Sequence, residues 1–121
     1  MTKEEFIARL FSLCQEAESG VMSSLKTPPV RSPNAGRLRR SKWFRSLSIR
    51  DQDSVREIVR YAAEFAVFLV LSELDGIGGV AANPEDGMYK LYYTEEGVDT
   101  LITDPRQEPL HDLFQSLRDF S

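Results

Sequence analysis

The sequence contains very little cysteine and histidine. Cys14 is the single cysteine among the 121 residues, so the chain forms no internal disulfide. His111 is the single histidine, which excludes a zinc site built from several histidines and cysteines of one chain. Cys14 falls on the apolar side of a predicted helix, where a buried structural thiol is expected. A reduced compartment suits this composition, and the sequence indicates no cofactor.

Long hydrophobic runs are also missing. The longest purely apolar run is AVFLVL, residues 66–71, whereas a membrane-spanning helix needs about 20 apolar residues. The beginning, MTKEEFIARL, carries two glutamates where a signal peptide would carry positive charge. We therefore expect a small acidic cytoplasmic protein with no membrane partner.

One segment has no acidic residue at all. Residues 26–50 contain eight bases and no acid, whereas residues 51–121 contain fifteen acids and five bases, in a chain of net charge −4. Six of these bases lie in RLRRSKWFRSLSIR, residues 37–50. Such polarised charge indicates that the basic stretch meets negative charge, either within the chain or on a partner.

Helical patterns occupy the beginning and the middle of the chain. Thr2 and Glu5 form a capping pair ahead of an amphipathic helix that Gly20 is placed to stop. A second helix is predicted up to Gly76, and Ser48 with Asp51, or Asp53 itself, can cap its start. Its first part has a polar side that includes Glu57 and Glu64, and its later part is apolar on every side. This central helix is therefore expected to be buried by the other elements or to face a second copy.

The remaining segments predict a connector, a hairpin and a last helix. Three prolines make residues 26–36 a mobile connector, after which a short helix around residues 39–47 is an open alternative. Residues 88–93 and 98–102 read as strands joined by a turn at Gly97, and a last helix spans about 109–120. The predicted fold is a single α+β domain, residues 1–121: three helices, the central one buried, with a β-hairpin in the C-terminal half.

Familiar catalytic motifs fit poorly. Gly76, Gly78 and Ala81 match a dinucleotide loop, but a helix precedes them where that loop requires a strand. Residues 75–86 have the length of a calcium loop but not its oxygen ligands. His111 and Asp112 are helix neighbours that point about 100° apart, so we expect a surface or packing histidine without an acid–base pair.

Glu73 is the acidic residue that raises the sharpest question. It falls on the stripe assigned to the core, where a carboxylate must be paired, protonated or hydrated. The helix end at Leu74 would let Glu73 reach water. Two more specific hypotheses are that Glu73 forms an ion pair with an arginine of the basic stretch, or that it is an active-site acid beside Asp75.

Four roles compete for the basic stretch 37–50. It could cover the chain's own acidic half with Trp43, Phe44, Leu47 and Ile49 in the core, or dock an acidic protein; these two readings are favoured together. It could instead bind nucleic acid, with arginines on phosphates and Trp43 stacking on bases. A membrane-surface helix fits least, because serines interrupt its apolar side. The predicted partner-binding residues are Arg37, Arg39, Arg40, Lys42, Trp43 and Arg45.

The function predicted from these features is a non-catalytic protein-binding or adaptor role, with a homodimer as one form of partner. The alternative is a nucleic-acid-binding protein that uses residues 37–50. A second alternative is a small enzyme with a carboxylate site near Glu73, Asp75 and His111. No catalytic, metal or cofactor-binding residue is assigned.

Overall fold

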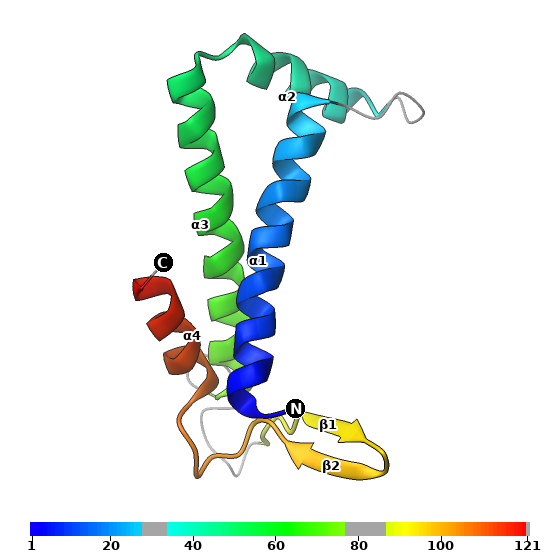
Figure 1. The fold of residues 1–121 in the computed structure, drawn as a ribbon, viewed down its shortest axis with the longest axis vertical. Helices are drawn as coiled ribbons and strands as arrows, with labels where there is room; N and C mark the ends of the chain where they lie inside the picture. Colours follow the sequence, from blue (N-terminus) through cyan, green and yellow to red (C-terminus); the bar gives the residue numbers. More distant parts are fainter. Residues whose placement is uncertain (28–33, 77–86, 121) are drawn as a thin grey trace. The chain divides into compact units, whose positions relative to one another are not determined.

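The computed structural model describes residues 1–27, 34–76 and 87–120. These residues form four helices and one antiparallel hairpin (Figure 1), which confirms the α+β fold. In chain order the elements are α1 (Lys3–Lys26), α2 (Ala35–Ser46), α3 (Ile49–Leu74), β1 (Tyr92–Glu95), β2 (Val98–Leu101) and α4 (Leu110–Asp119).

The chain divides into two compact units, and each is described by itself. The helical unit is Leu13–Ala63, and the hairpin unit is Met1–Ser12 with Glu64–Ser121. Residues 28–33 of the predicted connector and residues 77–86, which include most of the glycine motif, lie outside the described part of the chain.

Side-chain caps begin two of the helices as predicted. The Thr2 hydroxyl accepts a hydrogen bond from the Glu5 amide at 3.1 Å, and the Ser48 hydroxyl accepts one from the Asp51 amide at 3.1 Å. The predicted stop at Gly20 is wrong, because α1 continues through it to Lys26. The added turns bury Met22 and Leu25, and that burial outweighs the cost of about 1 kcal/mol for glycine in a helix.

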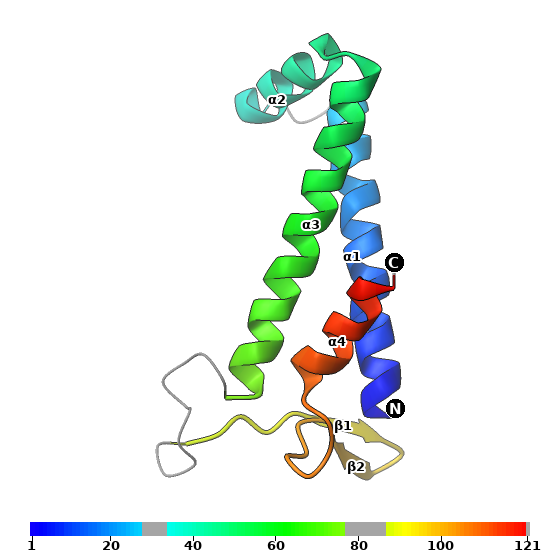
Figure 2. The same cartoon turned by 90° about the vertical axis from the view of Figure 1, so that its left-hand side faces the viewer.

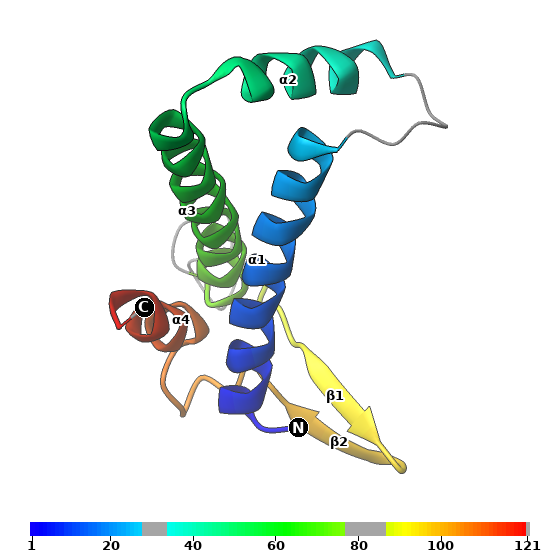
Figure 3. The same ribbon diagram turned by 45° about the horizontal axis from the view of Figure 1, so that its top comes forward.

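The helical unit is built around a small apolar cluster. Met22, Leu25 and Phe44 are buried together, and three partly buried residues pack against them: Leu47, Val55 and Val59. Helix α2 lies across the end of α1 and leads into the start of α3 (Figure 3). The short helix that the sequence left open is therefore present, and it contributes Phe44 to the core.

The core of the hairpin unit lies where α4 meets the beginning of α1 (Figure 2). Leu110 and Phe114 of α4 are fully buried, and the Phe114 ring meets Phe11 edge to face at 6.1 Å. Ile7 and Leu71 are buried in the same unit. Leu110 and Phe114, one helical turn apart, thus form the packing face of α4, while Phe120, just after its end, is exposed.

The β-hairpin has the predicted turn but shorter strands. Tyr92 pairs with Leu101, and Glu95 pairs with Val98, which leaves a two-residue turn. Both turn residues, Glu96 and Gly97, have positive φ values of 50° and 78°, as a two-residue hairpin with right-handed strand twist requires. Burial alternates at the start of the hairpin: Leu91, just before β1, and Tyr93 are partly buried, while Tyr92 is exposed.

A buried lysine joins distant segments of the hairpin unit. The Lys3 ammonium donates to the backbone carbonyl oxygens of Asp104 and Glu108 at 3.1 and 3.0 Å. Arg106 contacts the Asp104 carboxylate through its side chain and backbone, which lowers the pKa of Asp104 to about 2. The loop ahead of α4 is therefore held by charged groups as well as by packing.

Helix α3 is largely exposed in the described part of the chain, so its predicted burial by the other elements is not found, and the alternative that it faces a second copy stays a prediction. Its buried residues are Glu64 and Leu71, whereas Ile58, Leu69 and Val70 are between half and two-thirds exposed. Glu64, placed on the polar side by the sequence pattern, is buried because Arg118 of α4 lies 3.4 Å away. Helix α3 therefore packs against α4 with the side that carries Glu64, and the spacing of apolar residues in the sequence did not predict this side.

Candidate partner-binding site on helix α2

Helix α2 carries the predicted basic residues on a firmly capped helix. Asn34 begins it in an extended conformation, and its side-chain oxygen accepts a hydrogen bond from the Gly36 amide at 2.9 Å. The helix ends at Ser46, where the Leu47 amide bonds back to the Phe44 carbonyl oxygen. The twelve residues contain no acid, so nothing within the helix neutralises its bases.

Two buried residues fix the orientation of α2 within the helical unit. Phe44 is 1% exposed, and the fully buried Ser41 hydroxyl donates to the Leu25 carbonyl oxygen at 2.7 Å. The Gln52 side-chain amide donates to the carbonyl oxygens of Phe44 and Leu47, which ties the end of α2 to α3. These contacts turn the side of α2 that carries Ser41 and Phe44 toward the core and leave its other sides exposed to solvent.

The predicted partner-binding residues lie on these other sides. All of them are exposed: Arg37, Arg39, Arg40, Lys42, Trp43 and Arg45. Trp43, the only tryptophan of the chain, retains 53% of its surface. Within the described residues, no carboxylate lies within ion-pairing distance of these bases, and Arg45 bonds instead to the Ser41 carbonyl oxygen at 3.4 Å.

The structure tests one part of the reading in which this stretch covers the chain's own acidic half, namely the burial of its four apolar side chains. The covering of the acids itself stays a prediction. Phe44 and Leu47 are in or against the core as expected, but Trp43 and Ile49 are exposed, Ile49 by 74%. Carboxylates of the described chain pair with other cations, as Glu18 does with Arg60 at 3.8 Å. The bases of α2 thus form no ion pair with a carboxylate of residues 1–27, 34–76 and 87–120.

Charge follows the two units closely. The helical unit contains ten bases and five acids, a net charge of +5, and the hairpin unit contains five bases and fourteen acids, a net charge of −9. Together they give the −4 of the whole chain. The helical unit is thus a basic body by itself, despite the acidic composition of the protein.

An open groove runs beside α2 in the helical unit. It encloses about 390 Å³ and is lined by Val21, Ser24, Leu25, Arg37, Arg40, Trp43 and Val59. Aliphatic side chains from α1 and α3 form its apolar part, and the two arginines with Trp43 come from α2. Sequence reasoning identified the α2 residues but missed Val21, Leu25 and Val59, because nothing in their local pattern shows that three helices meet there.

Asp75 and His111, named in the enzyme alternative, are brought together in the hairpin unit. The two Asp75 oxygens accept hydrogen bonds from the Leu110 and His111 amides, and the second oxygen lies 2.7 Å from His111 Nδ1. The other ring nitrogen lies 3.2 Å from an Asp112 oxygen, so the expectation that His111 and Asp112 do not pair is wrong. The His111 ring packs edge-on against Phe68.

This arrangement is suited to anchoring α4. Pro109 precedes that helix without a side-chain cap, and Asp75 supplies the missing acceptor from 35 residues away. Both nitrogens of His111 already face carboxylates, so the geometry holds the ring in place. The pairing itself could not be read from local sequence because its partners are so far apart.

Glu73 lies at the partly exposed end of α3 in the hairpin unit. Its carboxylate accepts a hydrogen bond from the Tyr89 hydroxyl at 3.2 Å, and this bond raises the pKa of Tyr89. The helix ends one residue later, as expected. The contact found for Glu73 is thus with a tyrosine of the same unit.

Comparisons with known proteins and two searches of the structure complete the description. No protein-family model, curated protein or solved structure matches the chain. Over the described ranges, no group of three or more metal-ligating side chains could hold a metal ion. None of the described helices combines the length and apolarity that crossing a membrane requires.

Proposed function

We propose that this protein is a non-catalytic binding protein that docks an acidic segment of a partner protein on helix α2. The observation that carries the proposal is the groove beside α2, where apolar side chains adjoin arginines without ion-pair partners in the described chain. An amphipathic acidic helix would place an apolar side chain against Val21 and Leu25. Its carboxylates would then meet Arg37 and Arg40.

The lining of the groove favours a protein over a nucleic acid. Single-stranded nucleic acids bind on aromatic stacking surfaces along a basic track, and here one tryptophan stands beside the aliphatic residues Val21, Leu25 and Val59. Aliphatic side chains suit apolar side chains of a peptide and offer no stacking surface to a base.

The position of Trp43 allows a direct test. As the only tryptophan, it lines the groove, so its fluorescence reports binding there without a label. We would titrate the protein with a helical peptide of about 15 residues that has leucines one helical turn apart among glutamates. A scrambled peptide of equal charge and a single-stranded oligonucleotide provide the two comparison ligands.

We expect saturable binding of the patterned peptide and a loss of about tenfold or more in affinity for the double variant Arg37→Gln/Arg40→Gln. The matched control is Lys90→Gln, an exposed base of the hairpin unit, which should bind like the wild type. Equal affinity for the scrambled peptide would refute the proposal that the apolar side chains of the groove contribute to binding. Preferential binding of the oligonucleotide, with affinity falling steeply as salt rises, would assign the site to nucleic acid instead.

We also propose that a second copy of this chain is one such partner. The hairpin unit, with its net charge of −9, exposes apolar residues on α3 and at the end of α4, and the exposed fraction is above one-half for Leu69, Val70 and Phe120. An acidic surface with apolar side chains has the chemistry that the α2 groove requires. Sedimentation of the wild type over a range of protein and salt concentrations tests this form of binding.

A further inference from the structure

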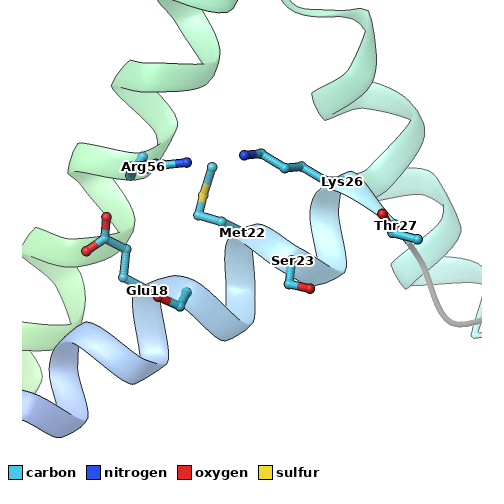
Figure 4. A pocket seen from close by; sticks show the side chains of 7 residues that line it. Glu18, Met22, Ser23, Lys26, Thr27 and Arg56 are labelled. Atoms are coloured by element: carbon cyan, nitrogen blue, oxygen red, sulfur yellow. The ribbon is translucent and has the colours of Figure 1, made fainter.

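A second pocket of the helical unit lies on another side of α1. It encloses about 340 Å³ and is lined by Glu18, Ser19, Met22, Ser23, Lys26, Thr27 and Arg56 (Figure 4). The last turns of α1 supply most of this lining, and α3 supplies Arg56. None of these residues lines the groove beside α2, so the two sites are formed by different side chains.

Two cations face each other across this pocket. The side chains of Lys26 and Arg56 extend toward one another over Met22, from α1 and α3 (Figure 4). Neither forms an ion pair with a carboxylate of the described residues. Like charges in this position repel each other, and an anion bound between them would be attracted by both.

The rest of the lining adds little charge to the space between the two cations. Ser23 and Thr27 are exposed residues of the lining, and in Figure 4 the Ser23 hydroxyl points away from the space between Lys26 and Arg56, so the two cations are the donors that face this space. The one carboxylate of the pocket, Glu18, lies 3.8 Å from Arg60, which offsets its charge. The C-terminal end of α1 contributes a partial negative charge of roughly one-half, which is smaller than the two full positive charges of the facing side chains.

We propose that this pocket binds a phosphate group. A phosphate presents several oxygens in a tetrahedral arrangement and carries up to two negative charges, so Lys26 and Arg56 can each reach a different oxygen. A single carboxylate presents only two oxygens, in one plane, to donors that approach from two helices. The phosphate can come from inorganic phosphate or from a phosphorylated side chain, and both share this chemistry. The proposal goes beyond the docking function and does not depend on it.

The test is an amide-resolved NMR titration of the intact protein with sodium phosphate and, separately, with phosphoserine. Sodium chloride at matched ionic strength is the reference. Saturable shifts are expected for the amides of residues 18–27 and 56, with a dissociation constant on the order of 1–10 mM for so exposed a site. Saturation by phosphoserine alone would assign the site to phosphorylated side chains, and saturation by both probes would assign it to phosphate groups in general.

Two variants and a control make the result specific. Lys26→Gln and Arg56→Gln should each weaken phosphate binding by about fivefold or more, whereas Lys42→Gln on α2 should leave it unchanged. The proposal is overturned if the shifts do not saturate up to about ten times the expected constant or follow ionic strength alone. It is equally overturned if Lys42→Gln weakens binding as much as the pocket variants do.

Discussion

Replacing Asp75 with alanine should weaken the anchoring of α4 in the hairpin unit. The Asp75 side chain is only 10% exposed, and it accepts from two backbone amides, at 3.1 and 2.8 Å, and pairs with the His111 ring. The loss of a helix cap costs about 1 kcal/mol, and a hydrogen bond to a charged group contributes about 1.5–3 kcal/mol. Because water can replace part of what is lost, we expect the free energy of unfolding to fall by about 2–4 kcal/mol.

A conservative variant distinguishes the contribution of the helix cap to stability from that of the negative charge of Asp75. Asp75→Asn keeps one oxygen for a helix amide but removes the negative charge beside His111, so its loss should be about half that of alanine. Urea unfolding followed by far-ultraviolet circular dichroism measures both free energies. Hydrogen exchange of the α4 amides shows whether that helix opens first.

The control is Glu57→Ala, an exposed acid of α3 in the helical unit, for which a change within about 0.5 kcal/mol is expected. The reasoning is refuted if Asp75→Ala changes the free energy of unfolding by less than about 0.5 kcal/mol. It also fails if asparagine is as damaging as alanine while α4 exchange stays unchanged, because the cap would then contribute nothing.

Two further predictions concern charge and self-association. Arg106→Gln should raise the pKa of Asp104 from about 2 toward its ordinary value of 3.8, since hydrogen bonds from Arg106 are the main cause of the lowered value. The pKa of Asp104 is lower in the folded than in the unfolded chain, so Asp104 stabilises the fold above about pH 4, and this contribution is lost as the pH falls toward 2. An NMR titration of the carboxyl group measures the pKa of Asp104 in both proteins. An unchanged pKa in the Arg106→Gln variant contradicts the assignment. Leu69→Gln should shift sedimentation of the protein toward the monomer without loss of helix content, because Leu69 is half exposed; association that persists at wild-type strength excludes the α3 surface.

Local signals predicted the helix starts and the hairpin turn. Thr2 and Ser48 were identified as caps because a cap depends on residues three positions away, and the turn at Gly97 because positive φ favours glycine. The stop at Gly20 failed because the turns that follow it bury Met22 in a core contributed by other helices. Local propensity is a small term beside such burial.

Contacts between residues far apart in the sequence could not be predicted at the two sites. The basic residues of α2 can be identified from the sequence alone, because a cluster of charge is visible in the composition without knowledge of any partner. The aliphatic residues that line the groove beside them come from α1 and α3, and no period in the sequence links Val21 with Val59. In the same way, the burial of Glu64 depends on Arg118, 54 positions later, and so the pattern placed it on the wrong side of its helix.

The division of the chain into units has a consequence for the order of events during synthesis. The helical unit is one continuous segment, Leu13–Ala63, so all of its contacts can form as soon as that segment has left the ribosome. The hairpin unit begins before that segment and is finished after it, since Lys3 must wait for the carbonyl groups of residues 104 and 108. A nascent chain arrested at about residue 100 should therefore already protect the α2 groove from protease, while its first turn of helix still lacks the partners that bury Lys3.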